Sequence, residues 1–217
     1  MTTHPAATQS PSVMLQLRDS TAHLHSQAEG HAFQRSLVSG TVTREDYARY
    51  LQQMLLVHQA LENALRAAAP KVPAINRVVT SEQYQEPYLL EDLRFYGASA
   101  TAVKPLPSTS ALIKRISAAW NSTPVALLGF HYVLEGSNNG NRFIARAIRG
   151  AFRLSGAEGL RYLDPYADRQ REVWAAFKTA MDAESFSEAD AHAMVDAAKA
   201  MFEGITAISQ DLVAKAS

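Results

Sequence analysis

A histidine and a glutamate one helical turn apart are the first residues in this sequence whose types and spacing suggest chemistry. His25 and Glu29 lie four residues apart, and residues at this spacing share one face of a helix. A carboxylate there can accept the imidazole N–H that faces away from a metal, which fixes the tautomer and makes the other nitrogen a better ligand. A solvated His–Glu pair on an exposed face is the common alternative, and spacing alone favours it. His23 and His31 are close in sequence but do not share this geometry.

A second segment, Tyr132-Val-Leu-Glu-Gly-Ser-Asn-Asn-Gly140, places two glycines inside an otherwise apolar helical pattern. Glycine within a helix costs about 1 kcal/mol relative to alanine, so its presence here calls for a reason. One interpretation is a kink that lets the backbone approach a flat ligand closely. The other is a plain loop that joins two helices, and the spacing does not decide between them.

The elements that must position these segments are helical almost throughout. Val13, Leu17 and Leu24 form one apolar stripe, and Gly30 and Gly40 end two short helical pieces. No strand-like alternation, internal repeat or linker divides the chain. The sequence therefore predicts one all-α domain at residues 12–217, a single-domain bundle of roughly eight helices, preceded by a disordered lead at residues 1–11. The further predicted helices span 43–68, 85–96, 108–122, 124–134 with a resumption at 142–152, 167–182 and 187–215.

Composition excludes several classes of function. The 217 residues carry 21 basic and 21 acidic side chains, and this zero net charge gives no bulk attraction to nucleic acid or to an anionic membrane. The absence of cysteine excludes disulfides, thiolate nucleophiles, Cys-ligated zinc and iron–sulfur clusters. No signal-peptide pattern and no run of about 18 apolar residues is present, so we expect a soluble cytoplasmic protein.

The two segments together resemble the heme oxygenase family. The run from Leu17 and Arg18 through Thr21 and His25 to Glu29 is similar to the family's proximal helix. Glu135-Gly-Ser-x-x-Gly140 resembles the distal-helix signature of its bacterial branch, and weaker similarity extends over residues 13–212. The resemblance implies a heme-oxygenase-like bundle that binds heme as both cofactor and substrate. It further implies ring opening with O2 and reductase electrons to biliverdin, CO and ferrous iron.

The resemblance also implies roles for single residues. His25 matches the axial iron ligand and Glu29 its orienting partner. Gly136 and Gly140 match positions where backbone lies over the heme, and Glu135 matches a carboxylate that supports a water network near the bound oxygen. The other positions that match heme-binding residues are Arg18, Tyr132 and Lys178 near the propionates, Ser137 in the distal segment and Phe202 in the pocket wall.

The implied partners are heme, O2 and an electron donor such as a ferredoxin or flavodoxin with its reductase. A bacteriophytochrome could accept the biliverdin, and iron acquisition from heme is an alternative purpose. Neither nucleic acid nor a membrane is expected as a partner. Asn138 and Asn139 replace the paired glycines of the animal-type enzymes, and Leu134 replaces another, so the distal geometry is where the sequence departs most from the family.

Two other functions remain open at this stage. One is a heme carrier or sensor that kept His25 without turnover. The other is a di-iron oxidase of the same fold, which would need several glutamates together with Glu-x-x-His pairs. The chain has no Glu-x-x-His, and His58/Glu62 and His131/Glu135 are spaced by four instead. We expect His58 to be a packed helix residue and His131 to have a structural or pocket-wall role.

Overall fold

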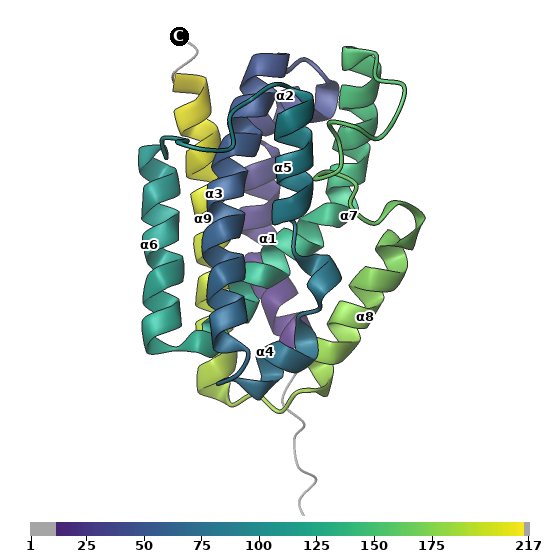
Figure 1. The fold of residues 1–217 in the computed structure, drawn as a ribbon. Helices are drawn as coiled ribbons and strands as arrows, with labels where there is room; N and C mark the ends of the chain where they lie inside the picture. Colours follow the sequence, from purple (N-terminus) through teal and green to yellow (C-terminus); the bar gives the residue numbers. More distant parts are fainter. Residues whose placement is uncertain (1–11, 215–217) are drawn as a thin grey trace, which may run out of the picture.

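A computed structural model describes residues 12–214, and this part of the chain is helical with no strand. It contains nine α-helices and three short 3-10 turns (Figure 1). The α-helices are α1 (Val13–Glu29), α2 (Ala32–Ser39), α3 (Arg44–Ala68), α4 (Pro73–Val78), α5 (Glu86–Phe95), α6 (Pro107–Ser122), α7 (Leu127–Phe152), α8 (Gln170–Ala183) and α9 (Glu188–Ala214). The 3-10 turns are η1 (Ser81–Gln83), η2 (Pro124–Ala126) and η3 (Ala167–Arg169).

Several helix ends lie where the sequence predicts them. The backbone N–H of Asp46 donates to Oγ1 of Thr43 over 3.0 Å, which caps α3. Ser187 and Asp190 cap the start of α9 reciprocally, each side chain accepting from the other's backbone N–H. Gly40 ends α2 in the left-handed conformation, with φ of 69°. These contacts satisfy backbone donors and acceptors that would otherwise lack a partner at the helix ends.

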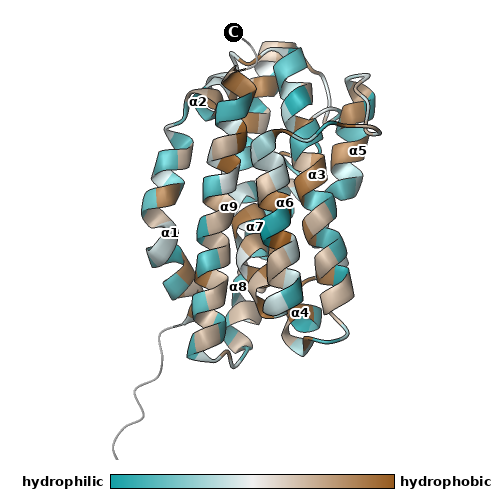
Figure 2. Ribbon diagram, turned by 90° about the vertical axis from the view of Figure 1, so that its left-hand side faces the viewer, coloured by the Kyte–Doolittle hydropathy of each residue, from teal (hydrophilic) through white to brown (hydrophobic). Residues whose placement is uncertain are grey.

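The long helices α3, α7 and α9 form the centre of the bundle. Helix α9 packs against α1, α6 and α7, while α3 packs against α5 and α6 (Figure 1). At the α7–α9 crossing, a Cβ on Gly129 would lie 2.0 Å from the carbonyl oxygen of Met194, so only glycine allows this approach. Both α3 and α9 carry hydrophilic as well as hydrophobic positions along their length (Figure 2), as expected for helices that each bury one face.

The structure corrects the sequence prediction at two helices. The predicted interruption at Gly136 and Gly140 is wrong, because α7 continues as one helix from Leu127 to Phe152. The polar side chains of this segment bond to their own helix: Ser137 Oγ donates to the Leu134 carbonyl over 2.7 Å. Helix α4, which begins at Pro73, was not predicted, and it brings the number of α-helices in the described residues from the expected eight to nine. Proline is well suited to the first turn of a helix, so Pro73 starts α4 as well as following the end of α3.

Two further predictions concern the N-terminal lead and the absence of a membrane-spanning helix. The lead at residues 1–11 lies outside the described residues. Between residues 12 and 214, no helix combines the length and the apolar character needed to cross a bilayer.

Candidate functional site

His25 lies on the outer part of α1 with an accessible imidazole. Its side chain is 56% exposed, and Nδ1 lies 3.7 Å from Oε2 of Glu29, one turn along the same helix. The edge of the ring meets Phe202 of α9, with 5.7 Å between ring centroids. Because Nδ1 is the nitrogen that faces the carboxylate, Nε2 is the one left for a metal bond. The structure thus brings His25 and Glu29 within ion-pair distance and places Phe202 against the imidazole.

Tyr132 connects the first half of α7 to α1. Burial raises the pKa of its phenol, while a hydrogen bond with Thr21 and the positive charge of Arg18 act in the opposite direction. The exposed Arg18 guanidinium also bonds Asp19 over 2.8 Å. Arg18 and Tyr132 therefore lie close enough for the guanidinium charge to act on the phenol. Lys178 is exposed on α8 and forms no ion pair with a described residue.

Glu135 is the only carboxyl on α7, and its surroundings perturb it strongly. It is 1% exposed, and its Oε2 accepts hydrogen bonds from the Tyr166 hydroxyl at 2.8 Å and the Asn138 amide at 3.4 Å. Its other oxygen, Oε1, is buried and has no hydrogen-bond partner. Burial raises the pKa of this carboxyl to about 7, although the two hydrogen bonds lower it in part. A carboxyl with this pKa can hold and release a proton near neutral pH.

The two glycines after Glu135 have different surroundings. A Cβ on Gly136 would lie 3.3 Å from the indole of Trp174, whereas a Cβ on Gly140 would meet nothing within 4 Å. Trp174 of α8 stacks on Phe177 and contacts the ring of Tyr132 at 5.9 Å. The α7 backbone is therefore approached by a flat side chain at Gly136 and faces open space at Gly140.

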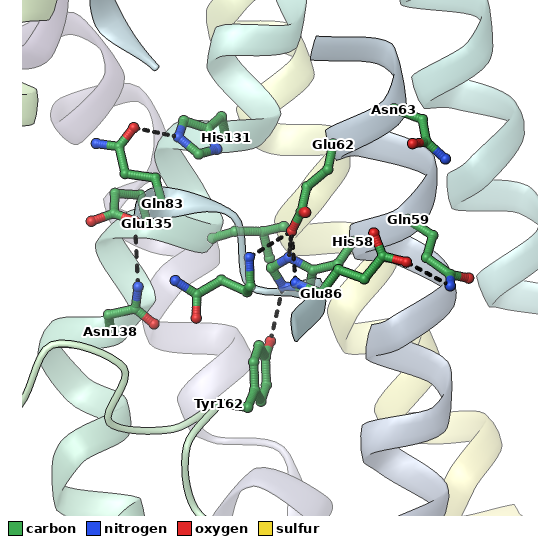
Figure 3. Close-up of polar contacts among 12 residues, drawn as sticks. His58, Gln59, Glu62, Asn63, Gln83, Glu86, His131, Glu135, Asn138 and Tyr162 are labelled. Atoms are coloured by element: carbon green, nitrogen blue, oxygen red, sulfur yellow. Dashed lines mark hydrogen bonds and ion pairs between the residues drawn. The ribbon is translucent and has the colours of Figure 1, made fainter. Parts of the chain in front are cut away.

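The histidines considered for a di-iron centre are held in other contacts (Figure 3). His58 is buried, with Nδ1 3.1 Å from Glu62 and Nε2 3.3 Å from the Tyr162 hydroxyl. The Nε2 atom of His131 lies 3.3 Å from the Gln83 side-chain oxygen, and burial lowers the pKa of its imidazole to about 4. Among residues 12–214 no group of three or more potential ligands could hold a metal ion.

The family model for heme oxygenase matches residues 12–211. The chain belongs to the heme oxygenase family. Members of this family bind heme as both prosthetic group and substrate.

The individual relatives agree with this assignment. A heme oxygenase of Rhodella violacea is 27% identical over 91% of this chain and 86% of its own length. One of Pyropia yezoensis is 28% identical over 69% of this chain and 63% of its own, slightly less than two thirds. The crystal structure of heme oxygenase-1 from Synechocystis sp. PCC 6803 in complex with heme shares the fold. It has a TM-score of 0.86 and 22% identity over 94% of this chain and 93% of that one.

The residues present fit a heme. The chain offers an accessible imidazole with a carboxylate beside its second nitrogen, open space over Gly140, and the buried unpartnered oxygen of Glu135. These are the features that a planar ligand with one axial bond and a polar face requires. Two clefts of about 370 and 420 Å³ also open in the described surface, but their walls include none of the predicted site residues.

Two residues of the site were missed by sequence reasoning. Trp174 is one of only two tryptophans in the chain, and its position one turn before the predicted Lys178 was an available signal. Tyr166 had no such signal, because it lies in the segment between α7 and α8 and meets Glu135 only through the fold.

Proposed function

We propose that this heme oxygenase binds heme through His25 and opens the ring to biliverdin, CO and ferrous iron with O2 and external electrons. The observation that carries the proposal is the accessible His25 imidazole beside Glu29, on a helix that lies within the family match. When bound, heme supplies both the site of O2 activation and the carbon that is oxidised. The part of the protein is to bind, orient and supply protons.

Each side chain has a separable task in this proposal. Glu29, whose Oε2 lies 3.7 Å from Nδ1 of His25, favours the tautomer with its proton on Nδ1 and so leaves Nε2 for the iron. Phe202 contacts the edge of the imidazole and limits its rotation. Arg18 and Tyr132 receive the anionic propionates, with Lys178 as a further cation on α8 and Ser137 in the neighbouring turn of α7. Glu135 on α7 holds a proton that the reaction can use.

A heme titration followed by turnover tests the proposal. With ascorbate or a reduced ferredoxin, the wild type should lose its Soret band and gain the long-wavelength absorption of biliverdin. His25→Ala should abolish this conversion, and added imidazole should restore part of it, while His23→Ala on another side of α1 should leave it unchanged. A stable Soret band in the wild type would contradict the enzymatic function and indicate a carrier. Wild-type rates in His25→Ala without imidazole would contradict the ligand assignment.

We propose that the second half of α7 and the two residues after it form the docking surface for the electron donor. Residues 141–154 contain four arginines and no acidic residue, and Phe143 among them is 65% exposed. None of these arginines forms an ion pair with a described residue. A basic surface with an exposed aromatic centre suits a small acidic ferredoxin or flavodoxin. The four arginines are Arg142, Arg146, Arg149 and Arg153.

Charge reversal separates docking from chemistry. Arg146→Glu should lower ferredoxin-supported turnover at low salt but leave ascorbate-supported turnover unchanged, because ascorbate does not need the docking surface. Arg115→Glu on α6 is the matched control, since it reverses an exposed charge on another helix. Equal effects of both variants, or an equal loss with ascorbate, would refute this docking surface.

The same proposal places the enzyme in the cytoplasm and gives a bacteriophytochrome as the acceptor of biliverdin. The lack of cysteine suits a reducing compartment. Incubating the turnover mixture with a phytochrome apoprotein, and measuring covalent chromophore loading against free biliverdin, tests the acceptor.

A further inference from the structure

The Tyr166 hydroxyl joins two buried polar side chains from distant parts of the chain. Tyr166 precedes η3, Gln85 precedes α5 and Glu135 lies on α7, and all three are buried. The Gln85 amide nitrogen donates to the Tyr166 hydroxyl over 3.2 Å, and that hydroxyl donates to Oε2 of Glu135 over 2.8 Å. The contact with Glu135 is the shorter of the two and links the segment after α7 back to α7 itself.

The protons that the Gln85 amide and the Tyr166 hydroxyl carry fix the direction of these hydrogen bonds. An amide N–H can only donate, so Tyr166 uses a lone pair to receive Gln85 and has its single proton left for Glu135. The Asn138 amide also donates to Oε2 of Glu135. Because Oε2 already accepts two hydrogen bonds, a proton on this carboxyl resides on Oε1. That oxygen is buried and has no protein partner.

Gln85 is itself held in place from α3. Its backbone N–H donates to Oε1 of Glu62 over 2.7 Å. Glu62 is in turn fixed by His58 at 3.1 Å (Figure 3). Arg66 also bonds Glu62, over 3.2 Å. A side chain whose supports are buried and hydrogen-bonded keeps one geometry, which is what a positioned proton donor requires.

A second observation points into the same region. The side-chain oxygens of Gln85 and Gln170 are buried and unpartnered, like Oε1 of Glu135. Buried acceptors of this kind are ordinarily satisfied by ordered water or by an acidic proton. The Gln85 and Glu135 oxygens each belong to a group bonded directly to the Tyr166 hydroxyl, so a water chain could begin beside this residue.

We propose that Tyr166 is a positioning residue for heme cleavage, which fixes Oε2 of Glu135 as the acceptor oxygen and Oε1 as the oxygen that delivers the proton. This inference rests on the proposed function, because it concerns proton supply to the same reaction. In the step, the O–H bond at Oε1 breaks and the proton passes to a water molecule in the site. The electron pair stays on Glu135, where the Tyr166 and Asn138 donors stabilise the charge, and solvent water later returns a proton to Oε1.

One other charged group acts on Glu135. Glu82 in η1 raises the pKa of Glu135 through space, and Glu82 is paired with Arg169 at 3.1 Å. Tyr166→Phe leaves the Glu82–Arg169 pair intact, so the only direct change at Glu135 is the lost hydrogen bond to Oε2, and the Gln85 amide loses its acceptor as well. The matched control is Tyr162→Phe, which removes another buried hydroxyl of the same segment, one that bonds His58 instead.

The test follows the carboxyl directly by infrared spectroscopy of the apoprotein between pH 5 and pH 9. The C=O band of protonated Glu135 is assigned by its loss in Glu135→Gln. Tyr166→Phe should raise the midpoint of this titration by about one pH unit, because it removes a donor to the ionised form. Tyr162→Phe should leave the midpoint unchanged. In the heme-loaded enzyme, Tyr166→Phe should lower kcat about tenfold with little change in heme affinity.

An unchanged midpoint in Tyr166→Phe, or an equal shift in Tyr162→Phe, would overturn the proposal. If Tyr166→Phe does not fold by circular dichroism, Gln85→Leu replaces it. This variant removes the Gln85 donor from the Tyr166 hydroxyl. The midpoint should therefore shift if that hydroxyl fixes Oε2 of Glu135, and an unchanged midpoint would overturn the proposal. Because the infrared titration needs no heme, its outcome is independent of whether the wild type produces biliverdin.

Discussion

Glu135→Gln should stabilise the protein relative to the wild type, and this gain in unfolding free energy should be larger at alkaline pH than at acidic pH. The carboxyl is 1% exposed, and burial raises its pKa from 4.5 to about 7. In the unfolded chain the group ionises near pH 4.5, whereas the folded protein keeps the proton until about pH 7. The unfolded state therefore binds fewer protons across this interval, and the wild-type free energy of unfolding falls as pH rises through it.

The size of the effect follows from the same two values. At about 1.36 kcal/mol per pH unit, the displacement corresponds to about 3 kcal/mol of lost stability once pH exceeds 7. Glutamine keeps the shape and an acceptor for Tyr166 but carries no charge. The difference in unfolding free energy between Glu135→Gln and wild type should thus grow by about 2.5 kcal/mol from pH 5 to pH 8, because a small part of the change already occurs below pH 5. Taking this difference cancels other titrating groups such as Asp92, whose pKa burial raises to about 6.

Urea denaturation of the apoprotein at several pH values measures this difference. Circular dichroism and tryptophan fluorescence should give coincident transitions, which establishes two-state unfolding. Glu172→Gln on α8 is the control, because it makes the same substitution at an exposed carboxyl. A pH-independent difference for Glu135→Gln would refute the reasoning and show that this carboxyl ionises as it does in water.

Three further outcomes follow from the packing. Gly129→Ala should destabilise the apoprotein by about 3 kcal/mol in urea denaturation, because its Cβ would overlap the Met194 backbone, and wild-type stability would contradict the close α7–α9 approach. Gly140→Ala should leave apoprotein stability within about 1 kcal/mol of wild type yet weaken heme binding, whereas unchanged binding would place heme elsewhere. In a Trp120→Phe background, heme titration should quench the fluorescence of Trp174 to near completion, and persistent emission would separate this indole from the heme site.

Much of the helical framework was predictable from local sequence. The caps at Thr43 and Ser187, the stop at Gly40 and the long amphipathic stretch of α3 use signals carried within a few residues. Helix α7 was predicted as interrupted because glycine and asparagine have low helix propensity. Packing of its apolar face against α9 overrides that propensity, and the side chains of Ser137 and Asn139 bond their own helix instead of forming a loop.

The sequence by itself determined the His25–Glu29 pair, because a spacing of four places both on one helical face whatever the helix packs against. It also singled out Glu135 and the two glycines as one segment, although it predicted an interruption where the structure has a continuous helix. Only the tertiary structure decided that Glu135 is buried and that Tyr166 donates a hydrogen bond to its Oε2. Tyr166 is 31 residues from Glu135 along the chain and 81 from Gln85, and no local pattern encodes such contacts. Burial and pKa depend on what surrounds a group in space, and packing between distant helices alone sets those surroundings.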